Sequence, residues 1–176
     1  MDSAALTIQP TDSYNLGTYL EVAIASYSEH YCHLWQHNDP SPYISKWLTK
    51  EVVFEELQDP DTLNYIVYHN TVAVGILKLI INCGIDEIPD TDAIKAEKIY
   101  LLKKHSGKGI GKQLLLIIEE MAVKLNKKVV WLDTMQKGNP IHFYKYNGYS
   151  IKRESEVVLP NVKPSEKHMW ILTKTL

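Results

Sequence analysis

The 176-residue sequence has only two cysteines, Cys32 and Cys83, and they form no C-x-x-C motif. Neither a disulfide framework nor a zinc ribbon is therefore expected. The sequence also lacks a long apolar run, because its longest stretch, VAVGILKLII at 72–81, is interrupted by Lys78. A membrane span needs roughly 20 apolar residues. We therefore expect no membrane partner.

The sequence also lacks a large excess of positive or negative charge, because its formal net charge is −2 and no basic tail is present. This balance gives no electrostatic reason to expect nucleic acid as a partner. The opening residues MDSAALTIQP contain no positive segment followed by an apolar one, so we expect no secretory signal and a cytoplasmic location. The length predicts one domain, 1–176, and leaves the oligomeric state open, a homodimer included.

The pattern of apolar residues predicts an α/β (α+β) fold. β-branched and aromatic runs predict strands at 6–10, 62–81, 96–104, 128–135, 149–158 and 168–176, the second being a hairpin that turns at 69–71. Helical spacing predicts helices that follow a cap at Thr11 or Asp12, and at 45–57, 112–126 and 139–147. Gly148 stands where helices favour a glycine.

The segment HSGKGIGKQLL at 105–115 places three glycines at the start of the predicted helix 112–126. A Walker A loop is excluded, because Ser106 and Gln113 occupy its required Gly and Ser/Thr positions. A Rossmann fingerprint is excluded by the G-x-G-x-G spacing. Successive amides at a helix N-terminus can bind phosphate. A glycine-rich turn with no ligand is the alternative.

The segment from Ser106 to Gly111 fits the pattern [QR]-x-x-G-x-[GA], with Ser106 at the Gln/Arg position, and NPIHFYKYNGY follows at 139–149. On these two motifs the sequence resembles the GNAT superfamily of acetyl-CoA-dependent N-acetyltransferases, over about Tyr65 to Tyr149. The resemblance implies a single GNAT-like domain with a mixed, twisted sheet of six to seven strands and about four helices. It also implies a V-shaped splay between the parallel strands at 97–102 and 129–133.

The resemblance further implies acetyl-CoA as cosubstrate and no metal. The pantetheine arm of acetyl-CoA would pair with the main chain of Ile99, Tyr100 and Leu101. Its pyrophosphate would be bound by Ser106, Gly107, Lys108, Gly109, Ile110, Gly111 and Lys112. The family's N-x-x-A pattern is not matched, since the corresponding position is Lys137, and Asn139 becomes the candidate for the pantetheine contact.

Two catalytic roles follow from the same resemblance. Tyr144 corresponds to the general acid that protonates the leaving thiolate, and Glu97 to the base that takes the proton of the amine, directly or through water. Without the resemblance, a helical tyrosine is usually a core residue, and Glu97 could be an exposed charge at a strand end.

The same resemblance implies an acceptor site built mainly from the first two helices and the loop before the central strand. Tyr31, Trp35 and Glu87 are candidates, because aromatic and acidic groups suit a cationic amine. A helix packed on the core and a solvated acidic loop would give the same composition. The sequence is similar to the PaiA-type polyamine acetyltransferases in the order of four segments, YIVY, VAVGILKLII, EKIYLLKKHSGKGIGKQLL and VVWLDTMQKGNPIHFYKYNGY. This similarity implies spermidine or spermine as acceptor. Protein N-terminal or lysine acetylation, and a catalytically silent CoA-binding sensor, are the alternatives.

His30, His33 and His37 are spaced i, i+3 and i+7, which predicts one helix face and a geometry that could bind a metal. A structural role, or a place in the lining of the substrate site, is the interpretation we favour. The acetyl-transfer chemistry implied by the resemblance does not require a metal.

Overall fold

The computed structural model describes residues 6–176. Residues 1–5, which belong to the segment used to predict the absence of a secretory signal, lie outside the described residues. Within the described range, none of the helices combines the length and the apolar composition that crossing a bilayer requires.

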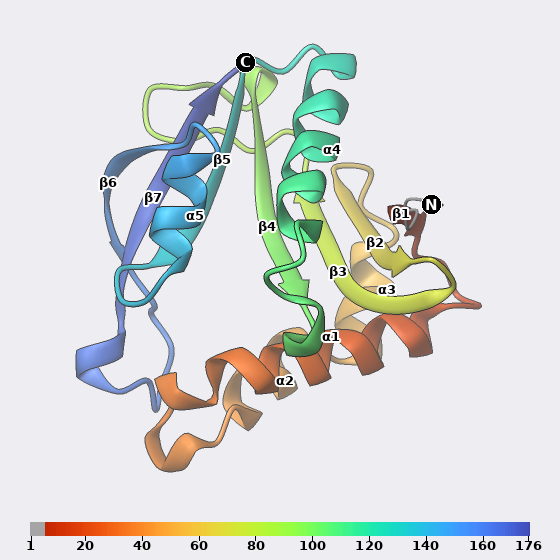
Figure 1. The fold of residues 1–176 in the computed structure, drawn as a ribbon, viewed down its shortest axis with the longest axis vertical. Coiled ribbons are helices and arrows are strands. Elements are labelled where there is room, and N and C mark those ends of the chain that lie inside the picture. Colours follow the sequence, from red (N-terminus) through yellow and green to blue (C-terminus); the bar gives the residue numbers. More distant parts are fainter. Residues whose placement is uncertain (1–5) are drawn as a thin grey trace.

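One seven-stranded sheet runs through the structure, in the order β1-β2-β3-β4-β5-β7-β6 (Figure 1). The strands are β1 Leu6–Pro10, β2 Thr62–His69, β3 Val72–Ile80, β4 Ala93–Leu101, β5 Val129–Met135, β6 Ser150–Glu156 and β7 His168–Thr175. Neighbouring strands are antiparallel except β4 and β5, which run parallel. The mixed sheet confirms the predicted fold class.

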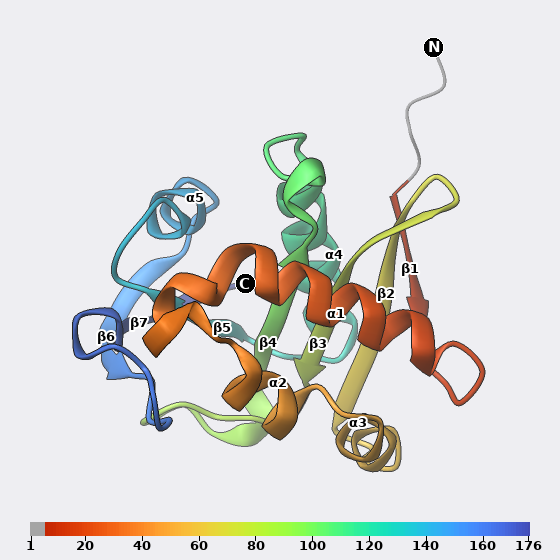
Figure 2. The same cartoon turned by 90° about the horizontal axis from the view of Figure 1, so that it is seen from below.

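Helices cover both faces of this sheet. They are α1 Leu16–Tyr31, α2 Ser41–Trp47, α3 Lys50–Glu56, α4 Ile110–Lys124 and α5 Pro140–Tyr146. Figure 2 shows α4 and α5 on one face, α2 and α3 on the opposite face, and α1 running across the middle of the view in front of the strands. The two larger hydrophobic clusters lie beneath α4 and beneath α1, and a small third cluster contains Ala93 and Trp131.

Each core joins one amphipathic helix to the central strands. Leu114 and Ile118 of α4 are fully buried against Leu79 of β3 and Ile94 of β4. On the other face, Tyr19, Ala23 and Tyr27 of α1 pack with Ile66 and Ile76 of the β2–β3 hairpin. The apolar stripes of α1 and α4 thereby fix both helices to the middle of the sheet.

The predicted helix at 45–57 is wrong as a single element. The chain leaves α2 at Leu48, and Thr49 adopts an extended conformation whose hydroxyl accepts a hydrogen bond from the amide of Val52 at 3.3 Å. Thr49 is thus the N-cap of a second helix, α3. This break explains why the structure has five α-helices where about four were expected.

Two predicted turns are confirmed. Asn70 has φ of 57° in the β2–β3 hairpin, and Gly148 has φ of 88° just beyond α5.

The strand predicted at 96–104 instead begins at Ala93 and ends at Leu101, and Lys103–His105 after it forms a 3₁₀ turn. The long helix begins at Ile110, two residues before its predicted start.

The three histidines do not share a helix face, so that prediction is wrong. α1 ends at Tyr31, which places His33 in a 3₁₀ turn at Cys32–Leu34. His37 has φ of 58° in a second turn at Gln36–Asn38. In the part of the chain that the structure describes, His, Cys, Asp and Glu side chains form no group of three or more suited to a metal ion.

Candidate active site

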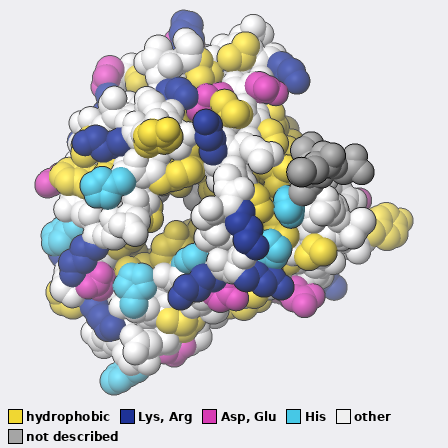
Figure 3. All heavy atoms as spheres, in the orientation of Figure 1, with side chains coloured by type: hydrophobic (Ala, Val, Ile, Leu, Met, Phe, Trp, Pro, Cys, Tyr) yellow, Lys and Arg dark blue, Asp and Glu magenta, His cyan; other side chains and the backbone are white. Residues whose placement is uncertain are grey.

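The parallel strands β4 and β5 pair over a short stretch and then separate. Ala93–Lys95 of β4 pairs with 129–131 of β5. Within residues 6–176, no other residues of these two strands pair with each other. The remaining edge of β4, from Ala96 to Leu101, therefore faces an opening. Figure 1 shows this V widening toward α1, and Figure 3 shows the surface hollowed between α5 and α4, with hydrophobic side chains on the walls.

An ion pair holds the closed end of the V. Lys95 is the last residue of β4 that pairs with β5, and its Nζ lies 2.9 Å from Asp133 Oδ2 on β5. The same ammonium lies 4.7 Å from the ring centroid of Trp131, within the range of a cation–π contact. The side chains on both strands thus set the point at which the sheet divides.

The glycine turn lies at the open end, at the N-terminus of α4. No backbone amide from Gly107 to Lys112 donates a hydrogen bond to any atom of residues 6–176. Gly107 and Gly109 have φ of 73° and 81°, which L-amino acids with a Cβ rarely adopt. Lys108 and Lys112 are exposed beside these amides. The turn therefore presents free donors and positive charge to solvent.

α1 anchors the start of this turn. The Glu29 carboxylate accepts a hydrogen bond from the amide of Lys103 at 2.6 Å. One residue along, the Nε2 of His30 lies 2.9 Å from the carbonyl oxygen of Leu101, at the end of β4. The helix at the mouth of the V is thus connected to the end of the unpaired strand and to the 3₁₀ turn that precedes the glycine turn.

Tyr144 lies on α5, on the opposite wall of the V. The centroid of its ring lies 5.1 Å from the ring centroid of Phe143 and 5.8 Å from that of Tyr149. Burial raises the pKa of Tyr144, and Tyr31 of α1 raises it further. A tyrosine hydroxyl is protonated at neutral pH even without this shift, as a proton donor must be. Asn139, at the start of α5, is exposed, and its side chain makes no capping bond.

A cavity of about 440 Å³ opens between α1 and the segment that joins β5 to α5. Its lining residues are His30, Tyr31, His33, Leu34, Met135, Lys137, Gly138, Pro140 and Glu166. Glu166, its single acidic residue, pairs with Lys137 at 2.7 Å. Glu166 could not be predicted from the sequence, because the segment 157–167 contains no motif and reaches the cavity only through the tertiary fold.

The three predicted acceptor-site residues are not brought together. Tyr31 lines the cavity and packs against Tyr27 and Tyr100. Trp35 is 1% exposed, and its Nε1 donates a hydrogen bond to the Tyr27 hydroxyl at 3.1 Å, so it lies within the core. Glu87 pairs with Lys152 at 2.5 Å in the β3–β4 loop, which Figure 1 shows at the closed end of the V.

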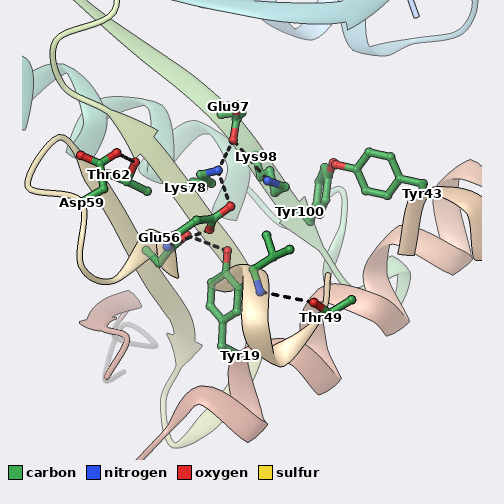
Figure 4. A network of polar contacts seen from close by, with 12 residues as sticks. Tyr19, Tyr43, Thr49, Glu56, Asp59, Thr62, Lys78, Glu97, Lys98 and Tyr100 are labelled. Atoms are coloured by element: carbon green, nitrogen blue, oxygen red, sulfur yellow. Dashed lines mark hydrogen bonds and ion pairs between the residues drawn. The ribbon is translucent and has the colours of Figure 1, made fainter. Parts of the chain in front are cut away.

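Glu97 occupies a β-bulge in β4. Lys78 of β3 pairs with Lys98, and the next residue, Leu79, pairs with Ala96, so Glu97 has no partner on β3. The Glu97 carboxylate instead lies 2.5 Å from Lys78 Nζ and 3.2 Å from Lys98 Nζ (Figure 4). Burial raises the pKa of Glu97, but the charges of Lys98 and Lys78 outweigh it and lower the pKa to about 2.

Comparisons with known proteins agree with this geometry. Residues 24–149 match the profile described as the acetyltransferase (GNAT) family. The chain is 27% identical, over 139 residues, to an uncharacterized N-acetyltransferase in the pepI 3′ region of Lactobacillus delbrueckii subsp. lactis. The match covers 78% of this chain and 79% of that protein.

Two solved structures have a similar fold. The PaiA N-acetyltransferase from Thermoplasma acidophilum, in complex with coenzyme A, matches with a TM-score of 0.75 and 21% identity, covering 98% of this chain and 99% of that one. The spermidine/spermine N-acetyltransferase SpeG from Vibrio cholerae matches with a TM-score of 0.67 and 15% identity, covering 97% and 92%. At these identities the likeness shows the fold and does not identify an acceptor.

Proposed function

Because the chain belongs to the acetyltransferase (GNAT) family, we propose that it transfers an acetyl group from acetyl-CoA directly to a primary amine. The observation that carries this proposal is the combination of an unpaired β4 edge with the free amides from Gly107 to Lys112. Both offer unpaired main-chain groups, which suit an extended pantetheine arm and a pyrophosphate.

The residues at the turn fit such a ligand. The amides from Gly107 to Lys112 would receive the pyrophosphate, with Lys108 and Lys112 adding positive charge and Ser106 flanking them. The main chain of Ile99, Tyr100 and Leu101 would pair with the pantetheine arm, with Asn139 beside it at the start of α5. When bound, acetyl-CoA supplies a thioester carbonyl that an amine can attack and a thiolate leaving group.

Tyr144 and Glu97 would handle the two proton transfers. Amide formation makes a C–N bond and breaks the C–S bond, and one proton must reach the leaving sulfur. The Tyr144 hydroxyl would donate that proton, since a tyrosine hydroxyl is protonated at neutral pH. The amine must lose a proton before attack, and the ionised Glu97 carboxylate would receive or relay it through water toward solvent.

Spermidine or spermine is the acceptor that we propose. The cavity beside Tyr31 offers an aromatic wall and the Glu166 carboxylate, which suit a cationic chain. Lys137 is 59% exposed at its side chain and can swing into solvent, so an ammonium group of the acceptor could replace it beside Glu166.

A peptide amino terminus is the second candidate. Among the lining residues, all within the described part of the chain, Glu166 is the one acid, and Lys137 already balances its charge. A cavity with so little surplus negative charge would accept a singly charged amine as readily as a polycation.

The test incubates the protein with acetyl-CoA and separate samples of spermidine, spermine and short peptides, and measures free thiol together with the mass of the product. Thiol and acetylated polyamine should form in equal amounts. Glu166→Gln should raise the KM for spermidine, whereas the matched variant Glu156→Gln should leave it unchanged, because Glu156 pairs with Lys167 outside the cavity. Acetylated peptide alone would support the second candidate, and no thiol release with any amine would contradict the proposed function.

A further inference from the structure

Two buried lysines contact the bulged carboxylate of Glu97. Lys78 of β3 is 6% exposed and Lys98 of β4 is 4% exposed, although lysine is rarely buried to this extent. Figure 4 shows both ammonium groups directed at the Glu97 carboxylate. Both lysines can reach the Glu97 carboxylate because the bulge places consecutive residues of β4 opposite one residue of β3.

A chain of hydrogen bonds fixes Lys78 from the other side. The Tyr19 hydroxyl donates to Asn64 Oδ1 at 2.9 Å, and Asn64 Nδ2 donates to Glu56 Oε2 at 3.1 Å. Glu56 Oε1 accepts a hydrogen bond from Lys78 Nζ at 2.7 Å. Lys78 therefore bridges Glu56 of α3 and Glu97 of β4, and its position is set by residues of four elements.

The charges in this cluster balance. Lys78 and Lys98 carry positive charge, and Glu56 and Glu97 carry negative charge, so the group as a whole is neutral. The titratable groups that interact electrostatically with Glu97 are Tyr19 on α1, Tyr43 on α2, Cys83 after β3, Lys78 on β3, and Lys95 and Lys98 on β4, and Glu56 on α3 shares Lys78 with it. Glu97 remains 26% exposed at its side chain, so solvent or an amine can approach it.

We propose that Lys78 and Lys98 are positioning residues that hold Glu97 as a charge-compensated carboxylate beside the reacting amine. An uncompensated carboxylate would stabilise the ammonium form of the acceptor, which binds well but cannot attack the thioester. Compensation by two lysines removes much of that stabilisation. The acceptor then loses its proton more readily, while Glu97 still presents an oxygen that accepts a hydrogen bond.

This inference rests on the proposed acetyl transfer to an amine, and it predicts a result that a structural role would not give. Lys78→Met should lower both the KM for the amine and the kcat at pH 7, because the amine binds more tightly as an ammonium ion and is deprotonated less easily. The kcat profile should move to higher pH by about 1 unit. Loss of packing alone would raise KM and leave the profile in place.

Conservative and matched variants complete the kinetic experiment. Lys78→Arg keeps the charge and should retain the wild-type pH profile. Lys95→Met removes a lysine from the same strand, but one that pairs with Asp133, and should shift the profile less than Lys78→Met. Lys98→Met is the second test if Lys78→Met fails to fold, because Lys78 then still bridges both carboxylates. An unshifted kcat profile in folded Lys78→Met or Lys98→Met would overturn the inference.

A titration that needs no activity separates this inference from the proposed function. The Glu97 carboxyl carbon, labelled with ¹³C and assigned by its loss in Glu97→Gln, is followed by NMR from pH 8 to pH 4. The wild-type signal should not titrate in this range, whereas that of Lys98→Met should begin to do so. Identical curves would overturn the lysine assignment, even where acetyl transfer is observed. If the wild type acetylates no amine, the proposed function fails, and the NMR curves still decide whether the lysines hold Glu97 ionised.

Discussion

Gly111 of α4 faces the ring of Phe143 on α5, so closely that a Cβ at Gly111 would lie 3.1 Å from Phe143 Cζ. The third glycine of the motif therefore sets the contact between the helix that follows the turn and the helix that carries Tyr144. This contact is local to the two motifs, and it explains why a glycine stands at this position although its φ is not positive.

The first prediction follows from that contact. Gly111→Ala should push α5 outward by a few tenths of an ångström and move Tyr144, which adjoins Phe143, so we expect kcat to fall several-fold, since small misplacements of reacting groups are costly. Steady-state kinetics with saturating acetyl-CoA measures the effect. Gly17→Ala is the control, because a Cβ there meets nothing within 4 Å, and the helix should gain about 0.5–1 kcal/mol of stability. Equal kcat in Gly111→Ala and wild type would argue against the role of this contact.

The second prediction concerns the turn itself. A Cβ at Gly109 meets no atom within 4 Å, so the effect of Gly109→Ala comes from its φ of 81° and not from a clash. The left-handed conformation costs a residue with a Cβ about 1–2 kcal/mol. We expect the free energy of unfolding to fall by about that amount and the Kd for CoA to rise about 10-fold as the amides lose alignment. Calorimetric titration with CoA measures the Kd, and an unchanged value would exclude the turn as the pyrophosphate site.

The third prediction isolates the general acid. Tyr144→Phe removes the hydroxyl and keeps the ring that packs against Phe143 and Tyr149. We expect kcat to fall by about 100-fold with little change in the Kd for CoA. Tyr146→Phe is the matched control, because Tyr146 belongs to the same helix but is 86% exposed and should leave both constants unchanged. A kcat near the wild-type value in Tyr144→Phe would remove Tyr144 from the mechanism.

The fourth prediction is the pH dependence of stability. The pKa of Glu97 is lowered to about 2 in the folded protein, below its value of about 4.3 in an unfolded chain. Its stabilising contribution is therefore complete above about pH 4.3 and disappears as the pH falls through about 2. Glu97→Gln should be less stable than wild type by about 1–3 kcal/mol at pH 7, because Lys98 loses its counter-charge and Lys78 keeps only Glu56.

Urea unfolding at several pH values tests this dependence. The stability difference between wild type and Glu97→Gln should shrink progressively between about pH 4 and pH 2. Glu120→Gln, an exposed change on α4, should leave stability unaltered at every pH. A difference that stays constant down to pH 3 would contradict the lowered pKa.

The sequence was sufficient where the requirement is local. Glycines with positive φ at 107 and 109 can be inferred from the motif, because only a residue without a Cβ adopts that backbone readily. The strands of the sheet could be predicted from alternation and from β-branched residues. The break between α2 and α3 was missed, although Thr49 is a recognisable N-cap, because the apolar spacing from Trp47 to Leu57 continues across it.

The remainder of the site depends on contacts between distant segments. Trp35 looks suited to an acceptor site, yet the fold buries it against Tyr27. Lys78 interrupts an apolar strand, and its pairing with Glu97 requires a bulge that follows from the register between β3 and β4. Register is a property of two strands together, so neither sequence segment alone predicts it.

The most direct test of the account is an NMR titration of the ¹⁵N-labelled protein with CoA, following each backbone amide. If CoA binds as proposed, the amides from Gly107 to Lys112 and those on the open edge of β4 should shift together, with one Kd, while the amides of β1 and β6 should not. Shifts confined to other parts of the chain, or unchanged amides at the turn under saturating CoA, would contradict it.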